Sequence, residues 1–179
     1  MSSTGTTAAS LVIGLDLQQA AVLAKGWQLE PAITERELTA AIWEGELLAQ
    51  REIVERTPRG IGSGGGLAGS IQAREPEIGG HLIVGLVGTP LVYAEPVEFG
   101  TRPHMPPAQP IRDWVRHVLG LGGAEGEAAT EAIRWKIFRH GTQGAHMFEG
   151  GFEAVRGQII DRFNLAVERI AAALAGAGR

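Results

Sequence analysis

Apolar side chains recur at helical spacing near the end of the chain. They share one narrow stripe, whereas Asp161, Glu168 and Arg169 lie off it. The stripe consists of Phe152, Ile159, Phe163, Ala166, Ile170 and Leu174. This pattern predicts a helix from Phe152 to about Ala175 that buries one face and exposes the other.

A second long helix is predicted from about Pro31 to Arg56, with a proline in its first turn and Pro58 beyond its end. Its apolar residues form two stripes on roughly opposite faces. The first stripe comprises Leu38, Ile42, Ala49 and Ile53, and the second comprises Trp43, Leu47 and Val54. A helix that is apolar on two faces is either sandwiched within its own fold or packs on its core and on a second partner. The pattern leaves both alternatives open.

Two apolar segments around a Gly-Gly turn, residues 71–78 and 81–88, predict a β-hairpin. Pro76 indicates that its first strand is irregular or lies at an edge. A short helix is expected at 16–26, closed by Gly26, and two more at 109–120 and 125–141. The order of helix, hairpin and helices is typical of the α+β class.

Length and composition limit the possible domain organisation and functions further. The 179 residues favour one domain, from 11 to 179, after a small and polar stretch, 1–10, that we expect to be disordered. The absence of cysteine excludes zinc fingers, iron–sulfur sites and thiol nucleophiles. With a net charge of −4 and no long apolar run, the sequence indicates neither a nucleic-acid-binding face nor a membrane span. We interpret most of the four tryptophans as core residues.

The candidate chemistry is sparse. A metal-dependent hydrolase would have to use His104, His140 and His146, with Glu98 or Glu149 as a carboxylate. These histidines show no His-Glu-x-x-His motif and no helical ligand spacing. The glycine-rich loop at 57–70 lacks the Gly-Lys-Ser/Thr ending of a phosphate loop. We therefore expect no enzyme, no metal and no cofactor, and keep the hydrolase as the alternative.

Three segments resemble, in order and spacing, the neck and tail-completion proteins of long-tailed bacteriophages, also called minor tail or head–tail joining proteins. They are "TP…GGGLAGSI" (57–71), "YAEPVEFGT" (93–101) and the closing "RHGTQGAHMFEGGFEAVRGQIIDRFNLAVERIAAAL" (139–174). The resemblance covers roughly residues 30–175. This chain differs from shorter family members in a helical insertion at about 109–140.

The resemblance implies an α+β subunit in which the long helix and the C-terminal helix pack on a small antiparallel β-sheet. It implies a structural virion protein that forms a ring, a hexamer or dodecamer, at the junction of head and tail. The expected partners are copies of the chain itself, the connector or adaptor, and tail-tube or tail-terminator proteins. The protein would be made in the host cytoplasm and act in the virion, without membrane or sequence-specific nucleic acid.

The densest stretch of the sequence, 93–107, is partly repeated about 40 residues later, since Gly100-Thr101 reappears as Gly141-Thr142. We interpret these segments as two structural joints that frame the insertion and fix its angle. The glycines would permit sharp turns with positive φ. Tyr93 and Phe99 would anchor the first joint, which also contains Glu98, in the core. The stripe of Trp43, Leu47 and Val54 would then contact the neighbouring subunit of the ring.

Overall fold

The computed structural model describes residues 17–58, 66–79 and 82–177, so the stretch 1–10 lies outside the described residues. The α+β class is confirmed, with long helices around a small antiparallel hairpin. The chain divides into two compact units where the sequence predicts one domain. The first unit comprises Met1–Ile53, Ile71–Gly88 and Glu149–Arg179, and the second comprises Val54–Ser70 and Thr89–Phe148.

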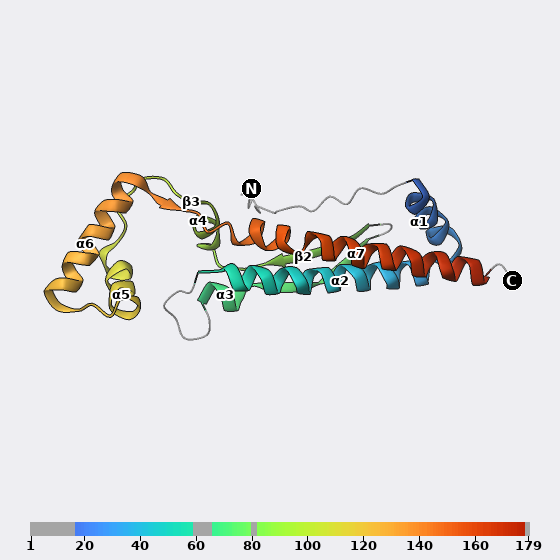
Figure 1. Ribbon diagram of the computed structural model, residues 1–179, viewed down its shortest axis with the longest axis horizontal. Coiled ribbons are helices and arrows are strands. Elements are labelled where there is room, and N and C mark those ends of the chain that lie inside the picture. Colours follow the sequence, from blue (N-terminus) through green and yellow to red (C-terminus); the bar gives the residue numbers. More distant parts are fainter. Residues whose placement is uncertain (1–16, 59–65, 80–81, 178–179) are drawn as a thin grey trace. The chain divides into compact units, whose positions relative to one another are not determined.

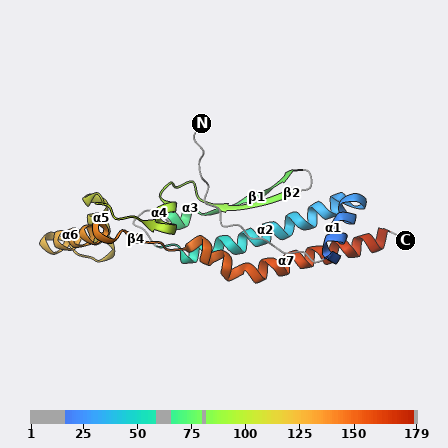
Figure 2. The same cartoon turned by 90° about the horizontal axis from the view of Figure 1, so that it is seen from above.

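The first unit is built on two long helices. Helix α2 (Pro31–Arg56) and helix α7 (Met147–Ala177) run side by side in both ribbon views (Figures 1 and 2). Their shared core contains Leu38 and Ala41 from α2 and Ala166 and Ile170 from α7. The predicted terminal stripe therefore faces the core, and the predicted helix is real but begins five residues earlier, at Met147.

The short helix α1 (Leu17–Leu29) corrects one prediction. Gly26 does not end it, because the helix continues to Leu29. A Cβ on Gly26 would lie 2.6 Å from Thr34 Oγ1 and 2.8 Å from Ile170 Cγ2. Gly26 therefore allows α1 to pack closely against its neighbours. In the sequence alone, a glycine with this role looks the same as one that ends a helix.

Strands β1 (Gln72–Gly79) and β2 (Leu82–Gly88) form the predicted antiparallel hairpin. The register shifts between Arg74 and Glu77, so Glu75 and Pro76 together lie opposite a single β2 residue, as in a β-bulge. The irregularity predicted at Pro76 is thus confirmed. Gln50 of α2 ties the start of this hairpin to the helix, since its amide donates to Ile71 O at 3.0 Å and accepts from Ala73 N at 3.2 Å.

The second unit contains the two helices predicted at 109–120 and 125–141. Helices α5 (Ala108–Val118) and α6 (Gly123–His140) form a helical hairpin, preceded in the chain by the short helices α3 (Gly66–Ser70) and α4 (Ala94–Phe99). The two-residue strands β3 (Gly100–Thr101) and β4 (Thr142–Gln143) pair with each other.

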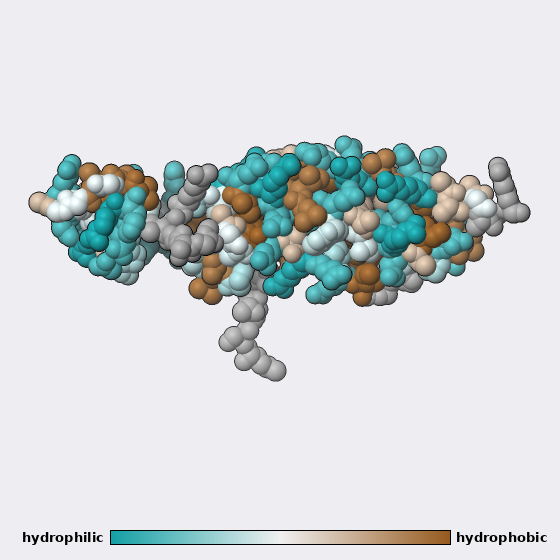
Figure 3. All heavy atoms as spheres, turned by 90° about the horizontal axis from the view of Figure 1, so that it is seen from below, coloured by the Kyte–Doolittle hydropathy of each residue, from teal (hydrophilic) through white to brown (hydrophobic). Residues whose placement is uncertain are grey.

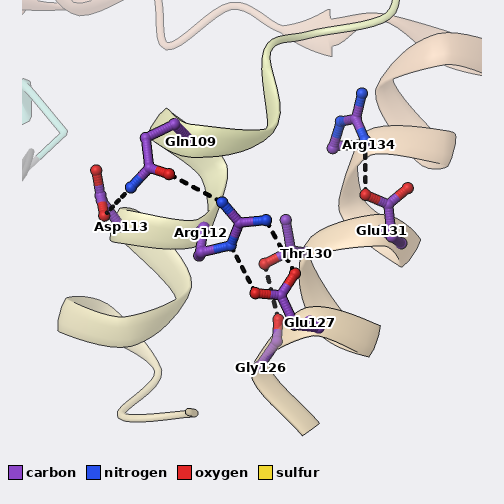
Figure 4. A network of polar contacts seen from close by, with 8 residues as sticks. All are labelled: Gln109, Arg112, Asp113, Gly126, Glu127, Thr130, Glu131 and Arg134. Carbon is purple, nitrogen blue, oxygen red and sulfur yellow. Dashed lines mark hydrogen bonds and ion pairs between the residues drawn. The ribbon is translucent and has the colours of Figure 1, made fainter. Parts of the chain in front are cut away.

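A polar network holds the two helices of the helical hairpin together (Figure 4). Arg112 of α5 donates two hydrogen bonds to Glu127 of α6, at 2.6 and 3.0 Å, and a third to Gln109 at 2.8 Å. The bond from Arg112 lowers the pKa of the Glu127 carboxyl. On α6, the buried Thr130 hydroxyl donates to Gly126 O at 2.7 Å. Gly126 and Thr130 are buried, so they lie on the face of α6 that packs within the hairpin.

Candidate functional site

The two repeated segments meet in the structure as one paired joint. Gly100 lies opposite Gln143, and Thr101 lies opposite Thr142. The hydroxyls of the two threonines are 3.0 Å apart, and Thr142 N donates to Thr101 Oγ1 at 3.2 Å. The repeat in the sequence therefore marks the two ends of the segment that contains α5 and α6, and the pairing of β3 with β4 holds these ends together.

The glycines of the joint meet a strict steric demand. Gly100 has φ +78° and Gly141 has φ +69°, so the predicted positive φ is confirmed at both. A Cβ on Gly100 would collide with the carbonyl oxygen of Thr142, and a Cβ on Gly141 would collide with that of Thr101. The close approach of the two backbones is thus possible only for residues without a side chain. That the joint fixes the angle of the insertion stays a prediction.

Glu98 extends the joint to the start of α7. Its side chain is only 5% exposed, and its carboxylate accepts a hydrogen bond from Phe148 N at 3.0 Å. Its own carbonyl accepts from His146 N at 3.1 Å, and the neighbouring Val97 carbonyl accepts from Ala145 N at 2.8 Å. A carboxylate at a helix N-terminus satisfies an amide that lacks a helical partner and suits the helix dipole. Glu98 therefore fastens the first turn of α7 to helix α4.

The prediction that Tyr93 and Phe99 anchor the joint in the core is wrong. Tyr93 is 46% exposed and Phe99 is 51% exposed. The residue that α4 buries is Glu98, and Met147, the first residue of α7, is fully buried. The short helix directs the hydrogen-bonding carboxylate inward, which leaves the adjacent aromatic ring outside.

The second stripe of α2 is largely exposed. Trp43 is 37% exposed and Leu47 is 44% exposed, whereas Val54 is half-buried. In the first stripe Leu38, Ala49 and Ile53 are buried. The helix therefore packs on its own core through the first stripe and presents Trp43 and Leu47 to solvent. The described part of the first unit therefore does not bury Trp43 and Leu47, and a contact of the second stripe with a partner stays a prediction.

Trp43 also lines a groove, which we call the α2–β1 groove. Its volume is about 680 Å³, and its apolar wall is made by Ala32, Ala40, Trp43, Pro76 and Ile78. Thr39 contributes a hydroxyl, and charged side chains of Glu35, Arg36 and Glu75 also line the groove. Gln50 holds the start of β1 to α2, and the groove opens where β1 passes the bulge at Pro76.

A buried carboxyl lies elsewhere on α2. Glu46 is 6% exposed, and a Cβ on Gly85 of β2 would lie 2.7 Å from its Cδ. Neither carboxyl oxygen completes a hydrogen bond within the described part of the chain, although the nearby Leu86 backbone acts to lower the pKa of this carboxyl. Burial raises the pKa of Glu46 to about 7. The absence of a Cβ at Gly85 gives this carboxyl its space.

Two further exposed apolar surfaces were not predicted from the sequence. On β2, Leu82, Val84 and Leu86 are 64%, 45% and 39% exposed, and their alternation places them on one face of the sheet. On the helical hairpin, Trp135 and Phe138 are 49% and 45% exposed. Figure 3 shows hydrophobic patches interrupting the hydrophilic surface, including the lobe formed by the hairpin. The interpretation of most tryptophans as core residues is therefore wrong for Trp135, Trp114 and Trp43.

The histidines of the alternative hydrolase lie in the second unit. His104 Nδ1 is 2.9 Å from Arg102 O, His140 ends helix α6, and His146 has φ +48° just before α7. Among the residues that the structure describes, no three His, Asp or Glu side chains converge in a way that could hold a metal ion. The described helices also include none that is long and apolar enough to cross a membrane.

Comparison of the chain with protein-family models, with curated proteins and with solved structures found no match in any of the three.

Proposed function

We propose that this chain is a structural subunit of the neck or tail end of a long-tailed bacteriophage. In this proposal it forms a homo-oligomeric ring that joins or completes the connection between head and tail. Its neighbours are further copies of the chain, the connector or adaptor, and a tail-tube or tail-terminator protein. The chain acts by assembly in the virion, without catalysis or a cofactor.

The observation that carries the proposal is the exposed apolar stripe of α2. A helix that already buries Leu38, Ala49 and Ile53 in its own core also presents Trp43 and Leu47 to solvent. Such residues on the surface of a subunit are typical of a protein–protein contact. The resemblance to the neck family supplies the kind of assembly, and two of its three motifs contribute to the paired joint.

The location of the protein in the particle tests the proposal. In the phage that encodes this chain, an epitope tag on the protein should be labelled by gold-conjugated antibody at the junction of head and tail. Capsids without tails and tails without capsids, separated from the same lysate, serve as controls for background label. A virion preparation from which the protein is absent would contradict the proposal.

The stripe itself is tested by a double substitution. Trp43→Glu with Leu47→Lys should give a folded monomer, with the circular dichroism of the parent chain, that neither forms rings nor supports head–tail joining. A control with Glu153→Lys changes the charge of an exposed position on α7 and should leave both properties intact. Normal assembly of the double variant would show that the ring contact lies elsewhere, and unfolding would assign the stripe to the subunit's own core.

A further inference from the structure

An aromatic cluster on α6 is about half exposed, with Trp135 at 49% and Phe138 at 45%. Trp135 and Phe138 meet edge to face, with ring centroids 5.4 Å apart and an angle of 89° between the planes. The Arg139 guanidinium lies 6.0 Å from the centroid of Trp135. On the helical wheel, this cluster is opposite the face on which Gly126 and Thr130 are buried. The cluster is therefore preorganised and points away from the helical hairpin, and we call it the α6 cluster.

The charges beside the α6 cluster are positive and unpaired. Lys136 and Arg139 form no ion pair with any residue that the structure describes, and both are exposed. The nearby Arg134 is different, because it is bound to Glu131 at 2.6 Å and to the Pro106 carbonyl at 3.0 Å. A mostly apolar surface with carboxylates at its edge would complement the α6 cluster in both shape class and charge.

The α2–β1 groove of the first unit has this chemistry. Its wall is mostly apolar, and the open space between α2 and β1 measures about 680 Å³. Two carboxylates lie at the groove, Glu35 and Glu75, and neither forms an ion pair within the described residues. The remaining charge, Arg36, is already engaged by Glu37 at 2.8 Å. The groove thus offers negative charge beside a mostly apolar wall.

We propose that the α2–β1 groove of one copy of this chain binds the α6 cluster of a second copy. Trp135 and Phe138 would enter the apolar groove beside Trp43, while Lys136 and Arg139 would pair with Glu35 and Glu75. Because the two surfaces differ, the contact is heterologous and propagates from copy to copy, which closes a ring when the rotation permits. The proposal rests on the proposed ring-forming function and assigns its second surface.

The absence of native cysteine makes a direct test possible, because any introduced thiol is unique. One copy carries Glu75→Cys, a second and differently tagged copy carries Lys136→Cys, and a short bismaleimide reagent joins thiols that lie close together. The control replaces Glu75→Cys by Glu153→Cys on the exposed face of α7. We expect a heterodimer yield several-fold above that of the control.

Equal yields from the two pairs, or no heterodimer, would overturn the proposal. A single chain that carries both cysteines distinguishes the remaining occupant of the groove. If the cross-link forms within that chain and not between chains at any concentration, the groove binds its own helical hairpin and the proposal is wrong.

Charge reversal tests the contact without thiols, by sedimentation of the purified full chain. Lys136→Glu with Arg139→Glu should weaken self-association about tenfold or more, because like charges would then face each other. Glu35→Lys with Glu75→Lys should do the same. The chain with all four substitutions should recover association, whereas losses that simply add would overturn the pairing.

The outcomes separate this inference from the proposed function. Gold label at the head–tail junction together with a failed cross-link would leave the function and remove the contact. A specific cross-link together with no label in virions would leave the contact and remove the function.

Discussion

Glu46→Gln offers the sharpest test of the interior of the first unit. The carboxyl of Glu46 is 6% exposed and completes no hydrogen bond within the described residues, so its charged form is penalised by burial. Glutamine has nearly the same shape but cannot ionise. The substitution should therefore remove a pH dependence of stability while leaving the packing against Gly85 nearly unchanged.

The sign and size of the effect follow from the pKa of Glu46, which burial raises from 4.5 to about 7. Below pH 4.5 the carboxyl is protonated in both the folded and unfolded states, so its charge has no effect. Between pH 4.5 and about 7 only the unfolded state loses the proton, so stability falls as the pH rises, and above about pH 7 the loss is complete. The full shift corresponds to about 3 kcal/mol of unfolding free energy.

Urea unfolding followed by circular dichroism, at half-unit steps from pH 4.5 to 8, measures this difference. The parent chain should lose stability across the range relative to Glu46→Gln, because all other titrating groups are shared and cancel in the comparison. Glu44→Gln is the matched control on the same helix, since Glu44 is exposed and pairs with Arg162 at 3.0 Å. Its profile should parallel that of the parent.

Parallel profiles for Glu46→Gln and the parent chain would refute the reasoning. They would mean that the carboxyl stays solvated, or finds hydrogen-bond donors, in the folded protein. A pH dependence that Glu44→Gln also removes would place the titration elsewhere on α2.

Two further substitutions, each with a control, test the core and the joint by urea unfolding. Ile170→Ala should cost about 2–5 kcal/mol, because Ile170 is fully buried, whereas Glu168→Ala should change stability by less than about 0.5 kcal/mol; similar costs would mean that the stripe of α7 is misassigned. Gly141→Ala should cost about 1–3 kcal/mol, because φ is +69° and the added Cβ meets the Thr101 carbonyl. Gly157→Ala, at an open position inside α7, should stabilise by about 0.5–1 kcal/mol, and equal behaviour of the two glycines would contradict the joint.

Periodic features of the sequence predicted the architecture well. The apolar stripes of α2 and α7 repeat over many turns. The helical spacing of these residues therefore predicts both the helix and the face that it buries. The irregularity at Pro76 could also be predicted, because proline has no N–H to donate to the hydrogen bonds between strands. Positive φ at Gly100 and Gly141 followed from the one residue type that adopts it freely.

The features that were missed depend on contacts between distant residues. In the sequence Gly26 looks like the end of a helix. Its packing role is visible only in the structure, where Thr34 and Ile170 lie close to it. Tyr93 and Phe99 were assigned to the core by residue type, but the hydrogen bond from Phe148 N to Glu98 decides which side of α4 faces inward.

The exposure of Trp135 follows from which face of α6 packs on α5. The spacing along the sequence places Gly126 and Thr130 on the opposite face of α6 from Trp135. Only the structure shows which of these two faces is buried. The burial of Glu46 has no comparable signal, because its position on α2 lies at the border between the apolar and charged sectors.

We propose that this chain joins heads to tails as a ring-forming structural protein, and disruption of its gene in a phage that carries it is the decisive experiment. Electron microscopy of the lysate should show separate filled heads and free tails, and infectious particles should return when the intact chain is supplied in trans. Complete, infectious particles in the absence of the protein would refute the proposal, as would an arrest before heads are filled.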